Sequence, residues 1–244
     1  TYDEMMQANK AGKIYIFKGI EGLAAIGEDL SKIDKYYDFG CRHAMLTWNE
    51  ANSLGAGALS GQSYGLTAAG KEAAKLIQAK GMLLDVSHLN DAGFWDIVKL
   101  AKKPIVASHS NSRVMCDVPR NLTDDQLRAI RDLDGVVGLN SFNIFVDHDP
   151  AKQTVENLAR HAEHMIDIMG IDHVGCGFDF FEFIEDEETM GSMAASSTPA
   201  VKGMDDASQI PNLFKVFEKM GLSQEERDKI ARLNFQAVVK KTIG

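Results

Sequence analysis

Two histidines in this sequence occupy equivalent places, each at the end of a short apolar run and each directly after a serine. His88 follows the run 82–86, and His109 follows the run 105–107. Neutral imidazole is a common ligand for zinc and other transition metals. The alternative is a structural role, in which each histidine only caps its strand through hydrogen bonds. The repeated Ser-His ending favours a metal site.

The chain between the two histidines predicts how they are positioned. Residues from about Asp91 to Lys102 have helical composition, with Asn90 as a capping residue before them and Pro104 after them. A strand, a helix and a second strand of this length form a parallel crossover. Because the carboxyl ends of parallel strands converge on one face, both imidazoles are expected close together at that end of the sheet.

Two carboxylates also stand at strand ends. Glu21 follows a strand predicted over Lys13–Gly19, and Asp179 ends a strand predicted over His173–Asp179. Each carboxylate also has a structural alternative. Glu21 could interact with a helix N-terminus, and Asp179 could be a loop or cap residue. If both carboxylates lie with the histidines at the carboxyl end of the sheet, they are candidates for metal binding and proton transfer.

The predicted elements alternate along the chain. Strands are predicted at 13–19, 43–48, 82–86, 105–107, 135–140 and 173–179, and helices at about 26–37, 67–80, 91–102, 123–133, 154–169, 206–220 and 223–242. This order predicts an α/β fold with a parallel sheet. No glycine-rich phosphate turn is present, so a TIM-like (β/α)8 barrel is favoured over a doubly wound sheet.

The barrel predicted in this way is incomplete. Six strands are two fewer than the eight that close such a barrel, and the chain opens on a helix-like segment. We therefore interpret residues 1–244 as a single barrel domain that lacks its first one or two βα units.

The remaining histidines are interpreted as structural. His43 and His173 begin predicted strands, at the end opposite the proposed site. His161 and His164 are expected on a solvated helix face, and the acidic run 182–188 is expected in a solvated loop.

Composition narrows the class of protein. The 244 residues carry a formal net charge of −9 and contain no basic cluster, which argues against nucleic acid or an anionic membrane as partner. No apolar run is long enough to span a bilayer. The three cysteines, Cys41, Cys116 and Cys176, are widely spaced and odd in number, as expected of reduced thiols. A cytoplasmic location is the prediction.

Seven segments, in order, carry a family resemblance: KGIEG, LTWNEAN, LLDVSH, PIVASHSNSR, DVPRNLTDDQLRAI, GVVGLN and HVGCGFDF. In these segments the chain resembles the renal (membrane) dipeptidase family of zinc peptidases, which have a metal-dependent amidohydrolase barrel. The similarity runs from about Lys13 to the C-terminal helix.

The resemblance implies a role for each matching residue. Glu21 matches the carboxylate that bridges two zinc ions, and His88 and His109 match the histidines that hold the second zinc. Asp179 matches the acid/base aspartate, and Arg120 matches the arginine that binds the carboxylate of the dipeptide. The implied reaction is hydrolysis of a dipeptide by metal-bound hydroxide. From its residue type alone, Arg120 is equally a candidate for a surface salt bridge.

Two departures from the family pattern are visible. The family's first zinc is also held by a His-x-Asp pair, and no His-x-Asp occurs in these 244 residues. Two zinc ions are expected in a complete site, and one or none in this chain. Well-known animal members have a histidine where this chain has Trp48, and an indole N–H neither shuttles a proton nor carries charge. Trp48 is interpreted as substrate-binding, with packing as the alternative.

Two other functions stay open. One is a related metal-dependent amidohydrolase that acts on another small amide or a lactone. The other is an incomplete, non-catalytic barrel that binds one metal or a partner. The expected partner is a dipeptide or a similar small substrate. The sequence leaves the oligomeric state open, with a homodimer as one alternative.

Overall fold

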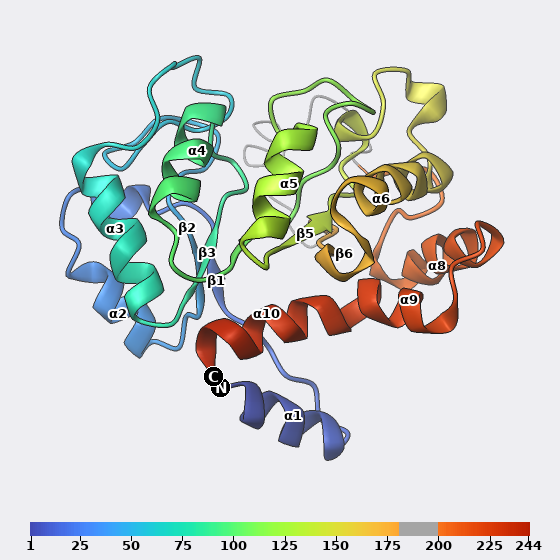
Figure 1. Ribbon diagram of the computed structural model, residues 1–244, viewed down its shortest axis with the longest axis horizontal. Coiled ribbons are helices and arrows are strands. Elements are labelled where there is room, and N and C mark those ends of the chain that lie inside the picture. The colour runs from blue at the N-terminus through green and yellow to red at the C-terminus, as the bar shows by residue number, and fades with distance from the viewer. Residues whose placement is uncertain (181–199) are drawn as a thin grey trace.

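The computed structural model describes residues 1–180 and 200–244 (Figure 1). Six strands form one parallel sheet whose spatial order follows the sequence. They are β1 (Gly19–Ile20), β2 (His43–Met45), β3 (Leu83–Asp85), β4 (Ile105–Ala107), β5 (Val136–Leu139) and β6 (Val174–Cys176). The predicted α/β fold with an incomplete, barrel-like parallel sheet is confirmed. The acidic run 182–188 lies outside the described residues.

Helices follow the strands in alternation. They are α1 (Tyr2–Lys10), α2 (Lys32–Asp38), α3 (Ala68–Ala79), α4 (Asp91–Leu100), α5 (Asp124–Asp132), α6 (Val155–Met169), α8 (Ile210–Lys219), α9 (Gln224–Asp228) and α10 (Asn234–Ile243). Side chains at the residue before the helix cap several of them, as Thr67, Asn90 and Thr123 do by accepting a backbone N–H. Short 3₁₀ turns lie at Ala24–Ile26, Asn143–Phe145, Pro150–Lys152, Ile171–His173 and Ala207–Gln209.

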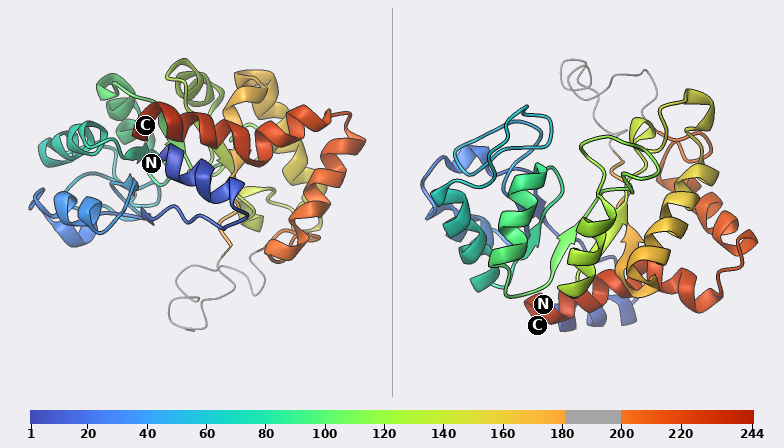
Figure 2. Two further views of the ribbon diagram at one scale, coloured as in Figure 1. Left: turned by 90° about the horizontal axis from the view of Figure 1, so that it is seen from below. Right: turned by 45° about the horizontal axis from the view of Figure 1, so that its top comes forward.

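The two faces of the sheet are covered differently. The large core lies between the outer face and helices such as α3 to α6. On the inner face, Leu83, Val106 and Val136 pack against Met5 of α1 and Val239 of α10. These two helices lie side by side below the strands (Figure 2). Loops cover the opposite end of the sheet, where the carboxyl ends of the strands lie.

Several predicted elements are wrong in extent. The strand expected over 173–179 is only Val174–Cys176, so Asp179 lies three residues beyond its end, and the strand expected over 43–48 is only His43–Met45. The strand expected over 13–19 is only Gly19–Ile20, and Ile14 and Ile16 are 92% and 85% exposed. Alternating apolar residues suit a strand with one covered face, but along residues 13–18 the described chain provides no neighbouring strand. The helix expected over 26–37 begins at Lys32, because Gly27 adopts φ +59° and interrupts it. The last helix is divided by a π-helical turn at Lys229–Leu233.

None of the helices in the described ranges is long and apolar enough to cross a membrane.

Candidate metal centre

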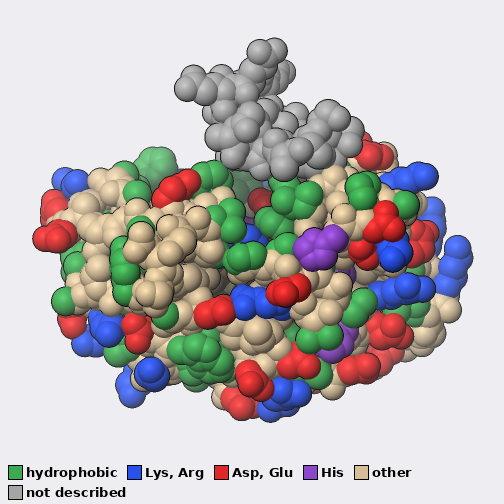
Figure 3. All heavy atoms as spheres, turned by 90° about the horizontal axis from the view of Figure 1, so that it is seen from above, with side chains coloured by type: hydrophobic (Ala, Val, Ile, Leu, Met, Phe, Trp, Pro, Cys, Tyr) green, Lys and Arg blue, Asp and Glu red, His purple; other side chains and the backbone are tan. Residues whose placement is uncertain are grey.

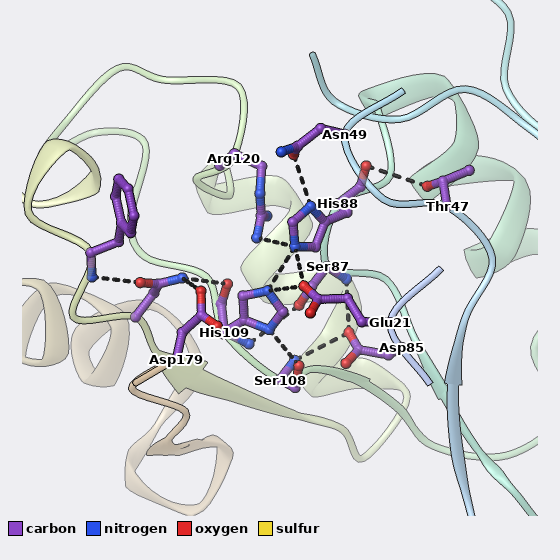
Figure 4. Close-up of polar contacts among 12 residues, drawn as sticks. Glu21, Thr47, Asn49, Asp85, Ser87, His88, Ser108, His109, Arg120 and Asp179 are labelled. Carbon is purple, nitrogen blue, oxygen red and sulfur yellow. Dashed lines mark hydrogen bonds and ion pairs between the residues drawn. The ribbon is translucent and has the colours of Figure 1, made fainter. Parts of the chain in front are cut away.

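Three donor atoms from three different strand ends converge at the carboxyl end of the sheet (Figure 4). Glu21 Oε1 lies 2.8 Å from His88 Nε2 and 3.4 Å from His109 Nε2, and the two Nε2 atoms are 2.8 Å apart. Outside residues 181–199, this is the one group of three or more His, Cys, Asp or Glu side chains that is close enough to share a metal ion. Imidazole nitrogens and a carboxylate oxygen are ligand types that bind metal ions, so this group could hold one.

Strand ends place each of these side chains. Glu21 directly follows β1, His88 comes three residues after β3, and His109 comes two residues after β4. His88 adopts φ +67° and Asp179 adopts φ +61°. These are two of the three non-glycine residues with positive φ in the described chain. Backbone in this region costs free energy, and such strain is concentrated at functional sites.

Hydrogen bonds to the other ring nitrogens orient both imidazoles. His88 Nδ1 donates to Asn49 Oδ1 at 2.8 Å, which leaves the lone pair of His88 on Nε2. His109 Nδ1 lies 2.7 Å from Ser108 Oγ. Partners of this kind fix ligand orientation in metal sites. Sequence reasoning missed Asn49, although it lies in the LTWNEAN segment just beyond a predicted strand.

Electrostatics favours the protonation states that a metal needs. Burial and the charge of Arg120 lower the pKa of His88 to about 3, against the opposing effect of Glu21. Burial raises the pKa of Glu21, but hydrogen bonds with His109 and His88 outweigh burial, and the net shift is downward. At neutral pH the cluster therefore offers a neutral imidazole at His88 and a carboxylate at Glu21.

Arg120 brings a positive charge to the edge of this cluster. Its side chain is buried, its Nη2 lies 2.9 Å from His88 Nε2, and its Nε has no hydrogen-bond partner. The guanidinium carbon lies 5.5 Å from the centre of the Phe145 ring. Burial lowers the pKa of Arg120 to about 10, so the group stays protonated at neutral pH. A buried guanidinium with a free donor is suited to bind an anion.

Asp179 lies on the other side of His109 from Glu21 (Figure 4). Its side chain is exposed, and Asn140 Nδ2 donates to its Oδ2 at 3.3 Å. It makes no direct contact with the three donor atoms, but its charge acts on Arg120. Asp179 thus borders the cluster from β6, the last strand of the sheet. Asn140, at the end of β5, was not predicted.

Comparisons with known proteins show the family of this chain. The model of the membrane dipeptidase family (peptidase family M19) matches residues 1–243. The chain belongs to this family. It is 36% identical over 231 residues to an uncharacterized protein of Klebsiella pneumoniae, covering 91% of this chain and 79% of the relative. It is 31% identical to an uncharacterized dipeptidase of Schizosaccharomyces pombe, covering 95% of this chain and 54% of the relative.

Solved structures of the membrane dipeptidase family share the fold. A metallopeptidase from Rhodobacter sphaeroides, liganded with a phosphinate mimic of the dipeptide L-Ala-D-Ala, superimposes with a TM-score of 0.87 at 30% identity. The match covers 99% of this chain and 67% of that one. The structure of a dipeptidase of peptidase family M19 gives a TM-score of 0.88 at 29% identity, covering 100% of this chain and 68% of that one. The chain spans about half the length of the curated dipeptidases that it matches.

Trp48 lies beside the cluster in this member of the membrane dipeptidase family. The centre of its ring is 6.0 Å from that of His88, with the planes tilted by 31°. The face of the molecule at the strand ends is hollowed, with acidic and basic side chains set back in the hollow (Figure 3). Trp48 is half-buried there, so its role in substrate binding stays a prediction.

The prediction for His161 is wrong. Instead of facing solvent, it is 1% exposed, and its Nδ1 accepts from Ser112 N while its Nε2 donates to Val146 O. This histidine thereby connects α6 to the loops after β4 and β5. His164 is partly exposed and lies 2.8 Å from Asp124.

This buried histidine should make stability pH-dependent. Burial lowers the pKa of His161, against the opposing hydrogen bond to Val146, so below about pH 6.5 the unfolded state binds a proton that the folded state does not. Lowering the pH from 7.5 to 5.5 should therefore lower the free energy of unfolding. Urea unfolding at both pH values, on metal-free wild-type protein and on metal-free His161→Gln, measures this loss of stability. Gln retains one donor and one acceptor at this position. An equal pH dependence in the two proteins would contradict the assignment.

Proposed function

We propose that this chain carries the Glu21, His88 and His109 half of a zinc dipeptidase centre, together with the groups that bind the substrate and move its protons. One observation carries the proposal: donor atoms from β1, β3 and β4 converge within hydrogen-bonding distances of one another. Membership of the membrane dipeptidase family supports a metal-dependent hydrolase.

The donor set fits zinc. Two imidazole nitrogens and one carboxylate oxygen are the usual ligands of catalytic zinc, and two ligands of one tetrahedral ion are about 3.3 Å apart. The three separations here are 2.8, 2.8 and 3.4 Å. The lone pair on His88 Nε2 faces the centre, because Asn49 accepts from the other nitrogen. When bound, zinc lowers the pKa of water and polarises a carbonyl group.

Arg120 is the proposed anchor of the substrate. A metal on His88 Nε2 would remove the acceptor that Arg120 Nη2 now faces, which frees the guanidinium for the terminal carboxylate of a dipeptide. Because Arg120 is buried and lies next to the metal ligands, a substrate held by its carboxylate has room for few residues before the scissile bond. This contact favours a dipeptidase over an amidohydrolase that acts on uncharged amides or lactones.

Asp179 is the proposed proton carrier. Its exposed carboxylate borders the centre, and the hydrogen bond from Asn140 orients it. From this place it can take a proton from the attacking water and return it to the departing nitrogen. We propose Trp48 as an apolar wall for the substrate beside His88.

The His-x-Asp pair that holds the other ion of a dinuclear centre in the family does not occur among the 244 residues. We propose that residues 1–244 act as one incomplete barrel domain and that ligands for a second ion come from another polypeptide segment. Cytoplasmic location stays a prediction, and a homodimer stays an open alternative.

Metal content per chain tests this proposal. Protein expressed with added zinc and purified without chelator should hold about one zinc ion per chain, by elemental analysis. Release of free amino acid from an unblocked dipeptide, abolished by chelator and restored by zinc, would show that one ion suffices for turnover. Bound zinc without turnover would favour the non-catalytic alternative, and protein without zinc would refute the centre.

A further inference from the structure

Asp85 is a buried charge that the mechanism does not use. It lies in the apolar run MLLDV, has 0% exposure, and ends β3 three residues before His88. Placing a carboxylate inside a protein costs several kcal/mol unless the carboxylate is hydrogen-bonded on every side. The partners of Asp85 therefore indicate what the residue does.

One oxygen of Asp85 connects the two histidine segments. Asp85 Oδ1 accepts from Ser87 N at 2.8 Å and from Ser108 N at 3.2 Å. Ser87 and Ser108 are the residues directly before His88 and His109. A single acceptor thus fixes the backbone from which each imidazole projects (Figure 4).

The other oxygen extends the connection toward Glu21. Asp85 Oδ2 lies 2.5 Å from His43 Nε2, on β2. The ring of His43 lies against Gly19 of β1, so closely that a Cβ atom at Gly19 would overlap His43 Nδ1. Gly19 is two residues before Glu21. The three strands that end in the candidate ligands are therefore joined through one carboxylate and one imidazole.

We propose that Asp85 is a positioning residue that holds His88 and His109 at the separation a metal ion needs. The inference rests on the zinc centre proposed above. The essential feature is an acceptor at Oδ1 that both amides share. In the wild type, His43 Nε2 donates to the carboxylate. Asp85→Asn retains the Oδ1 acceptor, and its Nδ2 donates to His43 Nε2 when the imidazole carries its proton on Nδ1. Asp85→Ala and Asp85→Leu remove the acceptor, and the leucine also fills the space.

Zinc affinity of the purified chain, measured by chelator competition, tests the proposal, with folding checked by circular dichroism. Partners of metal ligands typically contribute about 10- to 100-fold in affinity. Asp85→Ala and Asp85→Leu should therefore bind zinc at least about 10-fold more weakly, and Asp85→Asn within about 3-fold of wild type. The d–d absorption of the cobalt-substituted protein should change in the first two variants and not in the third.

Gln78→Ala is the matched control. Gln78 is also buried and connects two backbone positions with its side chain, accepting from Lys102 N and donating to Lys103 O. These positions lie before β4, at the end of the strand away from the centre. The control should lose stability but keep the wild-type zinc affinity. Weakened binding in this control would mean that general destabilisation explains the Asp85 variants.

Two results would overturn the proposal. One is wild-type zinc affinity in a folded Asp85→Ala or Asp85→Leu variant, and the other is an Asp85→Asn variant that binds zinc as weakly as either of these.

Amide hydrogen exchange tests the role of Asp85 independently of the zinc centre, because the measurement needs no metal. Ser87 and Ser108 amides should exchange slowly in wild type and Asp85→Asn, and faster without the acceptor. Wild-type protein that binds no zinc but shows this exchange pattern would refute the centre and keep the hydrogen-bond role of Asp85. Fast exchange in Asp85→Asn would refute that role, whether or not the other variants fold.

Discussion

Replacing His88 by Asn is expected to lower the zinc affinity of the chain by at least about 100-fold. Structural zinc is bound with about 10–16 kcal/mol, so one ligand among three or four contributes roughly 3 kcal/mol. Asn is the better first variant, because His88 adopts φ +67° and Asn tolerates this backbone more readily than Ala does. Its amide is too short to replace Nε2.

His164→Ala is the control for this measurement. His164 is on α6 and its ring contacts Asp124, away from the three donor atoms. The control should bind zinc as wild type does. Chelator competition gives both affinities, and unchanged binding in a folded His88→Asn protein would show that the metal, if any, is held elsewhere.

Replacing Arg120 by Ala is expected to weaken binding of unblocked dipeptides by about 10- to 100-fold, since a hydrogen bond to a charged group contributes roughly 1.5–3 kcal/mol. The affinity for dipeptides with an amidated C-terminus should change little in Arg120→Ala, because these ligands present no carboxylate. Calorimetric titration of zinc-loaded protein with both ligands measures the difference without requiring turnover. If turnover is observed, KM for the unblocked dipeptide should rise much more than KM for the amide.

Two further variants separate charge from shape at this position. Arg120→Met retains apolar volume beside Phe145 but not the charge, and should behave like Arg120→Ala. Arg128→Ala removes an exposed arginine of α5 that is paired with Asp125, and should leave the binding of both ligands unchanged. Equal losses for unblocked and amidated dipeptides in Arg120→Ala would contradict the proposed carboxylate contact.

The sequence was informative wherever local pattern and strand direction decide the outcome. Parallel strands align their carboxyl ends, so polar residues directly after apolar runs had to share one edge of the sheet. Glu21, His88 and His109 do meet there, and Asp179 borders them. The order of the strands and the start of α4 after Asn90 also follow from local chemistry. The metal, the substrate and the residue roles stay proposals.

Only the tertiary structure decided which residues support the centre. The sequence analysis did not single out Asp85, because its partners Ser108 and His43 belong to other strand segments and no local pattern reveals such pairs. His161 has the spacing of an exposed helix residue, yet the loops after β4 and β5 cover it. Residues 13–18 alternate like a strand, but a strand forms only where a neighbour supplies hydrogen bonds, and along those residues the described chain supplies almost none. Strand ends can be located from sequence because they depend on adjacent residues, whereas burial and long-range hydrogen bonds depend on which distant segments pack together.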